Sequence, residues 1–193
     1  MPTRRRAILI LSALCLLAVG SFMLALMVGS FKVAAPDVLA ALLGREGSGG
    51  EVVIELRLPR AIAGFACGGL LALAGALMQV LLRNPLADPC VLGISGGAGV
   101  GAMFALLLGL PVLGVDGLAF AGALGAMFIV FGLAHGDGSL TQTRLLLTGV
   151  IVAPGCGARV ALVVAVADEQ QLRGLVFWLM GDLAHTHPWG PHV

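Results

Sequence analysis

The chain has 193 residues, of which 59% are hydrophobic and 11% are charged, and its formal net charge is +1. Ordinary soluble domains carry about 25% charged residues, so this composition, with a mean hydropathy of +1.06, excludes a typical soluble domain. The near-neutral charge gives no indication of a nucleic-acid partner. The four cysteines show no CxxC or CxxH spacing that would indicate a metal or redox centre.

Charged residues are almost absent from five long apolar runs, and only Arg159 lies inside one of them. Each run has about 18–23 residues, the length that an α-helix needs to cross a hydrocarbon core of roughly 30 Å. A helix that is apolar on all sides suits lipid or the interior of a bundle. The sequence therefore predicts an all-α membrane protein, a polytopic bundle of about five transmembrane helices. The predicted spans are residues 7–29, 61–82, 91–110, 117–134 and 145–167.

The first run follows a basic segment, which is compatible with a signal peptide or with a retained transmembrane helix. Arg4, Arg5 and Arg6 precede an apolar stretch that is longer than the apolar core of a signal peptide, which has about 7–15 residues, and no clean A-x-A cleavage site follows. We therefore expect a retained first helix, and the positive-inside rule places the N-terminus in the cytoplasm. The predicted outer segments are residues 30–60, 111–116 and the chain from 168, and the predicted inner ones are residues 83–90 and 135–144.

Small residues recur every fourth position in the second and third runs. This spacing lets helix backbones approach closely, which is how membrane helices associate. An apolar segment rich in Gly and Ala also produces such spacings by chance. We favour the packing interpretation, with Gly64, Gly68, Gly93, Gly97 and Gly101 at helix contacts.

A short connection with two prolines, RNPLADP at residues 83–89, separates the second run from the third. Pro85 and Pro89 end the flanking helices and stiffen the chain. Asn84 and Asp88 can cap or turn the chain, so that backbone groups at the membrane surface find partners. Together with Arg83, these residues predict a rigid cytoplasmic hairpin.

Several motifs, in this order and spacing, resemble the FecCD-type permease family, the membrane subunits of ABC importers for ferric siderophores, haem and cobalamin. The similarity covers about residue 52 to residue 189. The motifs are LRLPR at 56–60, GALMQ at 75–79, RNPLADP at 83–89, LGISGGA at 92–98, RLLLTGV at 144–150 and FWLMG at 177–181.

The resemblance implies the first half of a ten-helix ABC importer permease that moves iron-siderophore, haem or cobalamin-type ligands across the inner membrane. It implies a second permease subunit, identical or different, and a periplasmic or lipid-anchored substrate-binding protein. It also implies cytoplasmic ABC ATPase subunits, and the chain itself lacks a GxxxxGK[ST] phosphate loop. We therefore expect a lipid-embedded transporter subunit that is not an enzyme, with no catalytic residue, cofactor or metal.

The resemblance assigns roles to two places. In the family, outer arginines pair with acidic residues of the binding protein, and this role maps onto Arg57 and Arg60. Both arginines also fit an alternative role as interfacial anchors, with their stems along lipid. The segment 172–183, with Phe177 and Trp178, matches an outer gate, although an aromatic pair after a span also fits an interfacial belt.

The chain departs from the family in its length and in its last run. Family members are nearly twice as long, and their second repeat carries the loop that contacts the ATPase, so we expect 1–193 to be a single, truncated permease domain. Pro154 and Arg159 interrupt the fifth run, and a charge there costs about 3 kcal/mol or more unless it faces a cavity or partner. Three interpretations remain open: a fragment of a permease, a half-size subunit that pairs with another chain, and a non-transporting remnant or membrane scaffold.

Overall fold

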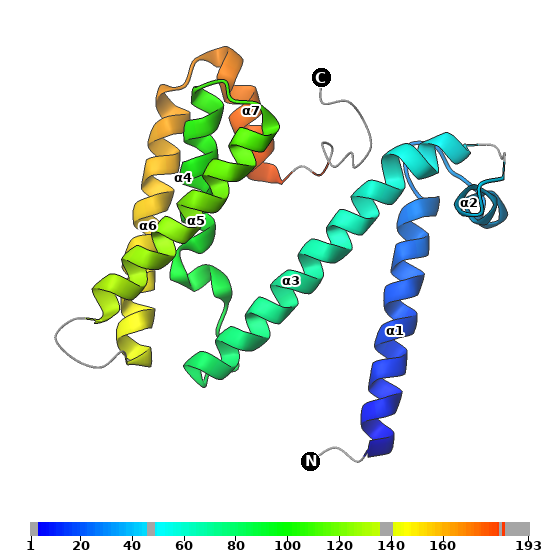
Figure 1. Cartoon of the computed structure of the whole chain (residues 1–193), viewed down its shortest axis with the longest axis horizontal. Coiled ribbons are helices and arrows are strands. Elements are labelled where there is room, and N and C mark those ends of the chain that lie inside the picture. Colours follow the sequence, from blue (N-terminus) through cyan, green and yellow to red (C-terminus); the bar gives the residue numbers. More distant parts are fainter. Residues whose placement is uncertain (1–3, 46–48, 136–140, 182, 184–193) are drawn as a thin grey trace. The chain divides into compact units, whose positions relative to one another are not determined.

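The computed structural model describes residues 4–45, 49–135, 141–181 and 183, and these residues form helices without any strand (Figure 1). The all-α prediction is therefore confirmed for the described chain. In order, the elements are α1 (Arg4–Met27), α2 (Ala35–Leu42), the π-helical segment η1 (Val52–Arg57), α3 (Leu58–Leu82), the 3₁₀ turn η2 (Pro89–Leu92), α4 (Ile94–Leu107), α5 (Val112–His135), α6 (Gln142–Val166) and α7 (Glu169–Met180).

Four helices in the described residues are long and apolar enough to cross a membrane. They are α1, the continuous helix Val52–Leu82 formed by η1 and α3, α5, and α6. At 1.5 Å per residue, α1 alone is about 36 Å long, which exceeds the thickness of a hydrocarbon core. These helices correspond to the first, second, fourth and fifth predicted spans.

The third predicted span, residues 91–110, is not one continuous helix. Residues Pro89–Leu92 form the 3₁₀ turn η2, and Gly93 follows with a left-handed φ of 72°. The helix α4 has only 14 residues, or about 21 Å, and Gly109 ends the segment with a φ of 65°. The predicted bounds are corrected because two glycines adopt a conformation that interrupts an α-helix.

The chain divides into two compact units, which we describe separately. Unit 1 contains residues 1–68 and 183–193, and unit 2 contains residues 69–182. The expectation of a single permease domain over 1–193 stays a prediction, and its last ten residues, 184–193, lie outside the described chain.

In unit 1, the C-terminal end of α1 packs against α2 and η1. Leu26 and Val53 are fully buried there, and Val33, Val38 and Ala41 complete the cluster. Further along the two helices, the rings of Phe22 and Phe65 meet edge to face with their centroids 5.2 Å apart. Both contacts hold the end of α1 beside the start of α3.

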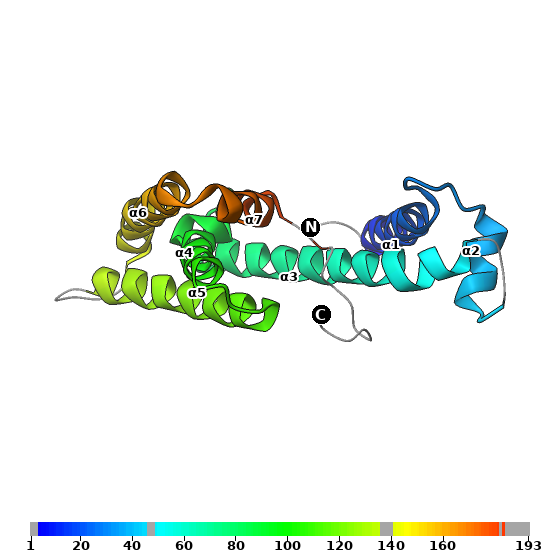
Figure 2. The ribbon, with the colours of Figure 1, turned by 90° about the horizontal axis from the view of Figure 1, so that it is seen from above.

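In unit 2, α4 packs against α5, α6 and α7 (Figure 2). One buried cluster joins Met78 and Leu82 at the end of α3 to Val130 of α5 and Leu145 of α6. A second cluster joins α4 to the start of α5 through small and branched side chains, and Trp178 of α7 packs against it. The short helix α4 is thus packed against the long helices α5 and α6 and the shorter helix α7.

The last long helix continues through its internal proline. Helix α6 begins after Thr141, whose hydroxyl oxygen accepts a hydrogen bond from the Arg144 backbone N–H at 3.3 Å. Pro154 removes one backbone donor inside the helix, and α6 nevertheless extends over 25 residues.

Candidate functional site

The predicted hairpin begins where α3 ends. Arg83 adopts a left-handed φ of 46°, its N–H donates to the Val80 carbonyl, and the Asn84 N–H donates to the Gln79 carbonyl. This pair of bonds is a Schellman motif, which satisfies the free carbonyls of the last helical turn. Glycine usually occupies the left-handed position of the motif, and an arginine occupies it here.

The rest of the hairpin is fixed by two short side chains. The Asn84 Oδ1 atom accepts a hydrogen bond from the Leu86 N–H at 2.9 Å, and the Asp88 Oδ1 atom accepts one from the Cys90 N–H at 2.6 Å. Asp88 is therefore the N-cap of η2, with Pro89 in its first turn. Leu86 stands at the tip and is 87% exposed. The cytoplasmic location of this hairpin stays a prediction.

Asp88 also acts on the neighbouring thiol. Its carboxylate accepts a hydrogen bond from Cys90, and this contact, with a smaller contribution from partial burial, raises the pKa of the Cys90 thiol. A raised pKa keeps the thiol protonated and less reactive near neutral pH.

Removing the Asp88 charge is therefore expected to make Cys90 react faster. In a variant with Cys15, Cys67 and Cys156 changed to alanine, Asp88→Asn lowers the pKa of Cys90 and increases its thiolate fraction near pH 7, while the amide oxygen still caps η2. The measurement is the rate of labelling by a membrane-impermeant maleimide added to either side of sealed vesicles. Labelling from the outer side alone would contradict the predicted topology, and an unchanged rate would contradict the role of the carboxylate.

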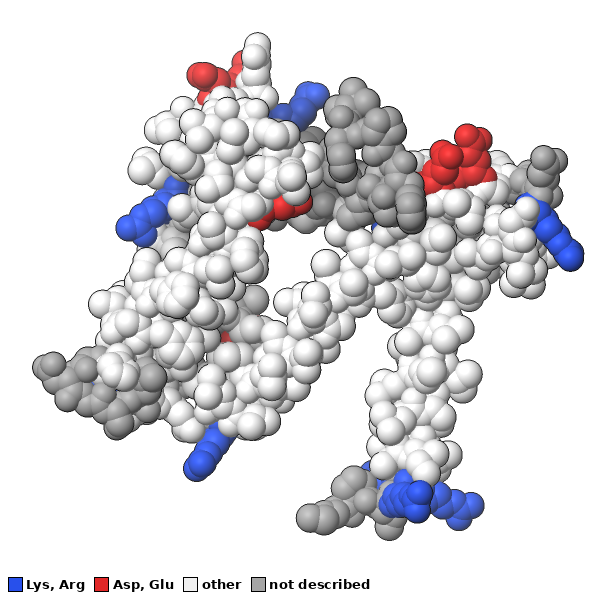
Figure 3. Space-filling model, in the orientation of Figure 1, with Lys and Arg blue, Asp and Glu red and all other residues white. Residues whose placement is uncertain are grey.

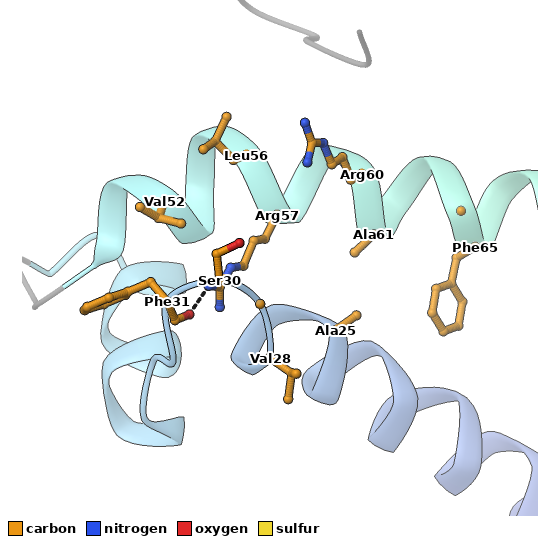
Figure 4. Close-up of a pocket in the computed structure, with 12 residues that line it drawn as sticks. Ala25, Val28, Ser30, Phe31, Val52, Leu56, Arg57, Arg60, Ala61 and Phe65 are labelled. Carbon is orange, nitrogen blue, oxygen red and sulfur yellow. Dashed lines mark hydrogen bonds between the residues drawn. The ribbon is translucent and has the colours of Figure 1, made fainter. Parts of the chain in front are cut away.

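The two arginines of the LRLPR motif lie in different surroundings (Figure 4). The Arg57 guanidinium is partly buried and donates to the backbone carbonyls of Leu26, at 2.8 Å, and of Met27, at 3.0 Å. It also donates to the Phe31 carbonyl. Arg60 is exposed and extends away from those carbonyls, and no hydrogen bond joins it to another described residue.

A cleft of about 650 Å³ lies between the end of α1 and the start of α3, and both arginines line it. Its other walls include Ser30, Phe31 and Phe65. Among the described residues that line it, none is acidic. The cleft therefore presents an apolar surface with a positive rim, which suits an anionic or acidic group at a water boundary.

The two aromatic residues of the predicted outer gate both lie on α7, but in different surroundings. Leu175 is buried and Trp178 is partly buried against α4 and α5, whereas Phe177 is 57% exposed. The side chain of Gln171 donates to the Leu107 carbonyl at the end of α4, at 3.4 Å. The gate role of segment 172–183 stays a prediction, and its residue Asp182 lies outside the described chain.

The predicted packing glycines differ in what they touch. A Cβ atom on Gly97 would collide with the Gly122 carbonyl of α5, and one on Gly101 with the Leu118 carbonyl. Gly93 lies against the backbone of Ala153 in α6, where an added Cβ would be 3.2 Å from the nitrogen. Sequence reasoning missed the partner Gly122, although Gly122 and Ala126 show the same spacing of four.

The glycines of α3 have fewer neighbours. No described atom lies within 4 Å of a Cβ built on Gly68, and Leu183 approaches one on Gly64 at 3.8 Å. Their packing role stays a prediction. Arg159 of α6 is also exposed, and its guanidinium donates to the Gly155 carbonyl at 3.3 Å.

The comparisons with known proteins agree on one family. The sequence matches the FecCD transport family over residues 15–191. It is 40% identical to the ferric enterobactin transport system permease protein FepD of Escherichia coli, covering 92% of this chain and 54% of that protein. It is 42% identical to the cobalamin import system permease protein BtuC of Halobacterium salinarum, covering 72% of this chain and 37% of that protein.

A solved structure extends the likeness to the fold. A metal-chelate type ABC transporter in an inward-facing conformation superposes with a TM-score of 0.79 at 28% identity. The match covers 93% of this chain and 55% of the other. The chain thus spans about half the length of FepD and of this transporter chain.

Proposed function

Because the chain belongs to the FecCD transport family, we propose that it forms part of the membrane permease of an ABC importer. The observation that carries the proposal is the structural match over nearly the whole chain, at a TM-score of 0.79. The four helices that are long and apolar enough to cross a membrane add support, since they suit a multi-pass protein of the inner membrane.

The proposed cargo is an iron-siderophore, haem or cobalamin-type ligand. The named relatives are permeases for ferric enterobactin and for cobalamin. These ligands are large chelates, and this is the class that we assign to the chain. The alternatives of a remnant or a membrane scaffold find no support among these relatives.

Transport of such a ligand needs partners. We assign ATP hydrolysis to separate cytoplasmic ABC ATPase subunits, ligand delivery to a periplasmic or lipid-anchored binding protein, and the other wall of the pathway to a second permease subunit. Repeats in transporters build their pathway jointly, and this chain has about half the length of its relatives.

The proposed orientation has the N-terminus in the cytoplasm. Arg4, Arg5 and Arg6 are exposed at the start of α1, and the surface of α1 beyond them carries no charged side chain (Figure 3). The positive-inside rule favours this end for the cytoplasm. The helix Val52–Leu82 then returns from outside, so the arginine motif begins outside and the hairpin after Leu82 lies inside.

The outer arginines are the proposed contact for the binding protein. Arg60 is exposed at the rim of a cleft whose described lining residues include no acidic side chain, which favours an acidic partner surface. Charge complementarity of this kind raises the association rate and fixes the orientation of a complex. The aromatic pair Phe177 and Trp178 is assigned to the outer gate on the resemblance of its segment to the family pattern.

Ligand uptake by intact cells tests the proposed function. Deleting the gene from its host is expected to abolish uptake of one class among radiolabelled cobalamin, haem and ferric siderophores, and expression in trans should restore it. A variant with Gly125→Ala, which meets no described atom within 4 Å, serves as the folded control. Unchanged uptake of all three classes after deletion would contradict the proposal, provided that no second importer is encoded.

A further inference from the structure

Arg159 lies well inside α6, one of the candidate membrane spans. It stands about 25 Å from the start of the helix and about 10 Å from its end, at 1.5 Å per residue. Its guanidinium donates to the Gly155 carbonyl, one turn earlier, at 3.3 Å. The side chain thus follows the usual direction of helical side chains, toward the N-terminus of its helix. It extends toward the middle of the span and away from the nearer end.

The described part of unit 2 offers this cation no carboxylate. Its acidic residues are Asp88, Asp116, Asp168 and Glu169, and all four lie outside α6. The polar partner that the described chain gives to Arg159 is a carbonyl of the same helix. A charged side chain at membrane depth is costly unless it meets an opposite charge or water. We therefore look for its partner outside the chain.

Arg159 lies on a side of α6 that the chain leaves uncovered. The covered side packs against α4, where Cys156 is buried and a Cβ atom on Gly96 would lie 2.8 Å from the Cys156 Cβ. Leu162 and Val166 follow Arg159 by three and seven residues, so the helical period places them near its stripe. They are 64% and 70% exposed. This stripe therefore faces lipid or a space outside the chain.

Small residues keep the guanidinium open to a bulky partner. Gly155, Gly157 and Ala158 have no side chain beyond a Cβ atom. A Cβ on Gly157 would meet no described atom within 4 Å, and one on Gly155 would meet only the Arg159 Nη1 atom, at 3.9 Å. A guanidinium holds five N–H donors in a planar fork, which matches paired anionic oxygens such as those of a carboxylate.

The helix that carries Arg159 leads directly into the segment assigned to the outer gate. Helix α7 begins at Glu169 and is held to α4 by Trp178 and by the hydrogen bond from Gln171. Ionisable side chains at membrane depth almost always face a bundle interior or a water-filled cavity, and they mark the paths of substrates. Of the two surroundings open to the stripe, the charge favours the pathway over lipid.

We propose that Arg159 lines the transport pathway and selects an anionic chelate, whose carboxylate or catecholate oxygens give it a net negative charge. The inference rests on the proposed function and narrows its cargo. A ferric tricatecholate, a ferric carboxylate or haem, with its two carboxylates, fits this arginine. Cobalamin and a ferric trihydroxamate that is neutral overall give the guanidinium no net charge to balance.

The class of imported ligand is the first test. Cells that lack the gene are compared with the parent strain for uptake of four radiolabelled probes: a ferric tricatecholate, haem, cobalamin and a neutral ferric trihydroxamate. We expect the loss to be confined to an anionic probe, the tricatecholate or haem. Loss of cobalamin or trihydroxamate uptake would overturn the selection by Arg159 while leaving the importer role intact. Unchanged uptake of every probe would instead contradict the importer role, and the inference with it.

The second test measures import of that anionic probe by the reconstituted permease assembly. Arg159→Gln is expected to lower the initial rate about tenfold, the effect of losing one charge-assisted hydrogen bond. Arg159→Lys keeps the charge and should retain most of the rate, whereas Arg159→Glu should lower it further. Arg144→Gln is the matched control, because it removes an exposed arginine from the start of the same helix. It should import at the unchanged rate.

The size of the purified assembly separates a ligand contact from a subunit contact. An intact assembly with slow import in Arg159→Gln, recovered in Arg159→Lys, supports the proposal. If Arg159→Gln separates the chain from its partner subunit, the arginine pairs with a protein carboxylate, and the proposal is overturned. An unchanged rate in Arg159→Gln also overturns it, since the side chain then meets lipid headgroups or water without touching the ligand.

Discussion

Gly101→Ala is expected to destabilise the packing of α4 against α5 by about 1–3 kcal/mol, the range for overpacked interiors. The added Cβ atom would meet the Leu118 carbonyl, which is backbone and cannot rotate away. Gly97→Ala should behave alike, because its Cβ would meet the Gly122 carbonyl. Two helices that touch through backbone atoms must separate to admit one methyl group. The measurement is the midpoint of unfolding of the purified protein in mixed micelles.

The matched control lies on the same helix pair. A Cβ atom added to Gly125 or Gly117 of α5 would have no described atom within 4 Å, so a change of either residue to alanine meets open space. Alanine is a better helix former than glycine by about 0.8–1.0 kcal/mol, so these variants should be neutral or slightly more stable. If Gly101→Ala and Gly125→Ala lowered the stability of the protein equally, the close approach of α4 and α5 would not exist in the membrane.

Arg159→Leu is expected to favour membrane insertion of α6 by about 2.5–3.5 kcal/mol or more, the cost of an arginine at a helix centre. Arg159 lies seven positions before the end of α6, about 10 Å along its axis. Its guanidinium donates to Gly155, on its N-terminal side, and so does not extend toward the nearer end of the helix. The measurement is the inserted fraction of the segment Gln142–Val166 in a glycosylation-mapping host protein.

Two neighbouring substitutions calibrate this result. Ala158→Leu adds the same side chain one position earlier without removing a charge, and it should favour insertion by less than about 1 kcal/mol. Arg159→Lys should leave insertion nearly unchanged. If Arg159→Leu raises the inserted fraction no more than Ala158→Leu does, the Arg159 side chain reaches the interface at no cost. In that case α6 needs no polar partner at this depth.

The sequence was most informative about the long helices. Runs without charge predict membrane spans because a charge in hydrocarbon is costly, and four of the five predicted runs correspond to candidate spans. The break at Gly93 was not predictable in the same way. A left-handed glycine inside an apolar run changes neither composition nor charge, and only the preceding Asp88-Pro89 pair signals the new start.

The charged segments contain helices that hydropathy did not reveal. Residues 30–60 include α2 and the π-helical start of the helix Val52–Leu82, and their outer location stays a prediction. Glu55 and Arg57 lie within η1, so the helix continues beyond the apolar run into water-accessible sequence. Hydropathy locates the hydrocarbon core, and a helix does not have to end at that boundary.

The candidate site was located in part by its motif. LRLPR indicated two arginines of one kind, and the structure places them differently: Arg57 donates to backbone carbonyls, whereas Arg60 is exposed. The partners of Arg57 are backbone carbonyls about 30 residues earlier, which have no side-chain signature and become visible only when α1 ends beside η1. A pattern of residue types cannot distinguish an arginine that binds carbonyls from one that remains free for a partner.

ATP-driven import into proteoliposomes tests the proposed permease role most directly. The permease assembly that includes this chain would be reconstituted with its ATPase and supplied with the ligand-loaded binding protein. We expect the ligand to accumulate inside only when ATP and the binding protein are both present, and Arg60→Glu to reduce the initial rate about tenfold or more. The contrary result is the same amount of ligand inside the proteoliposomes with and without ATP, although the ATPase hydrolyses ATP normally. That result would contradict a role for this chain in an ABC importer.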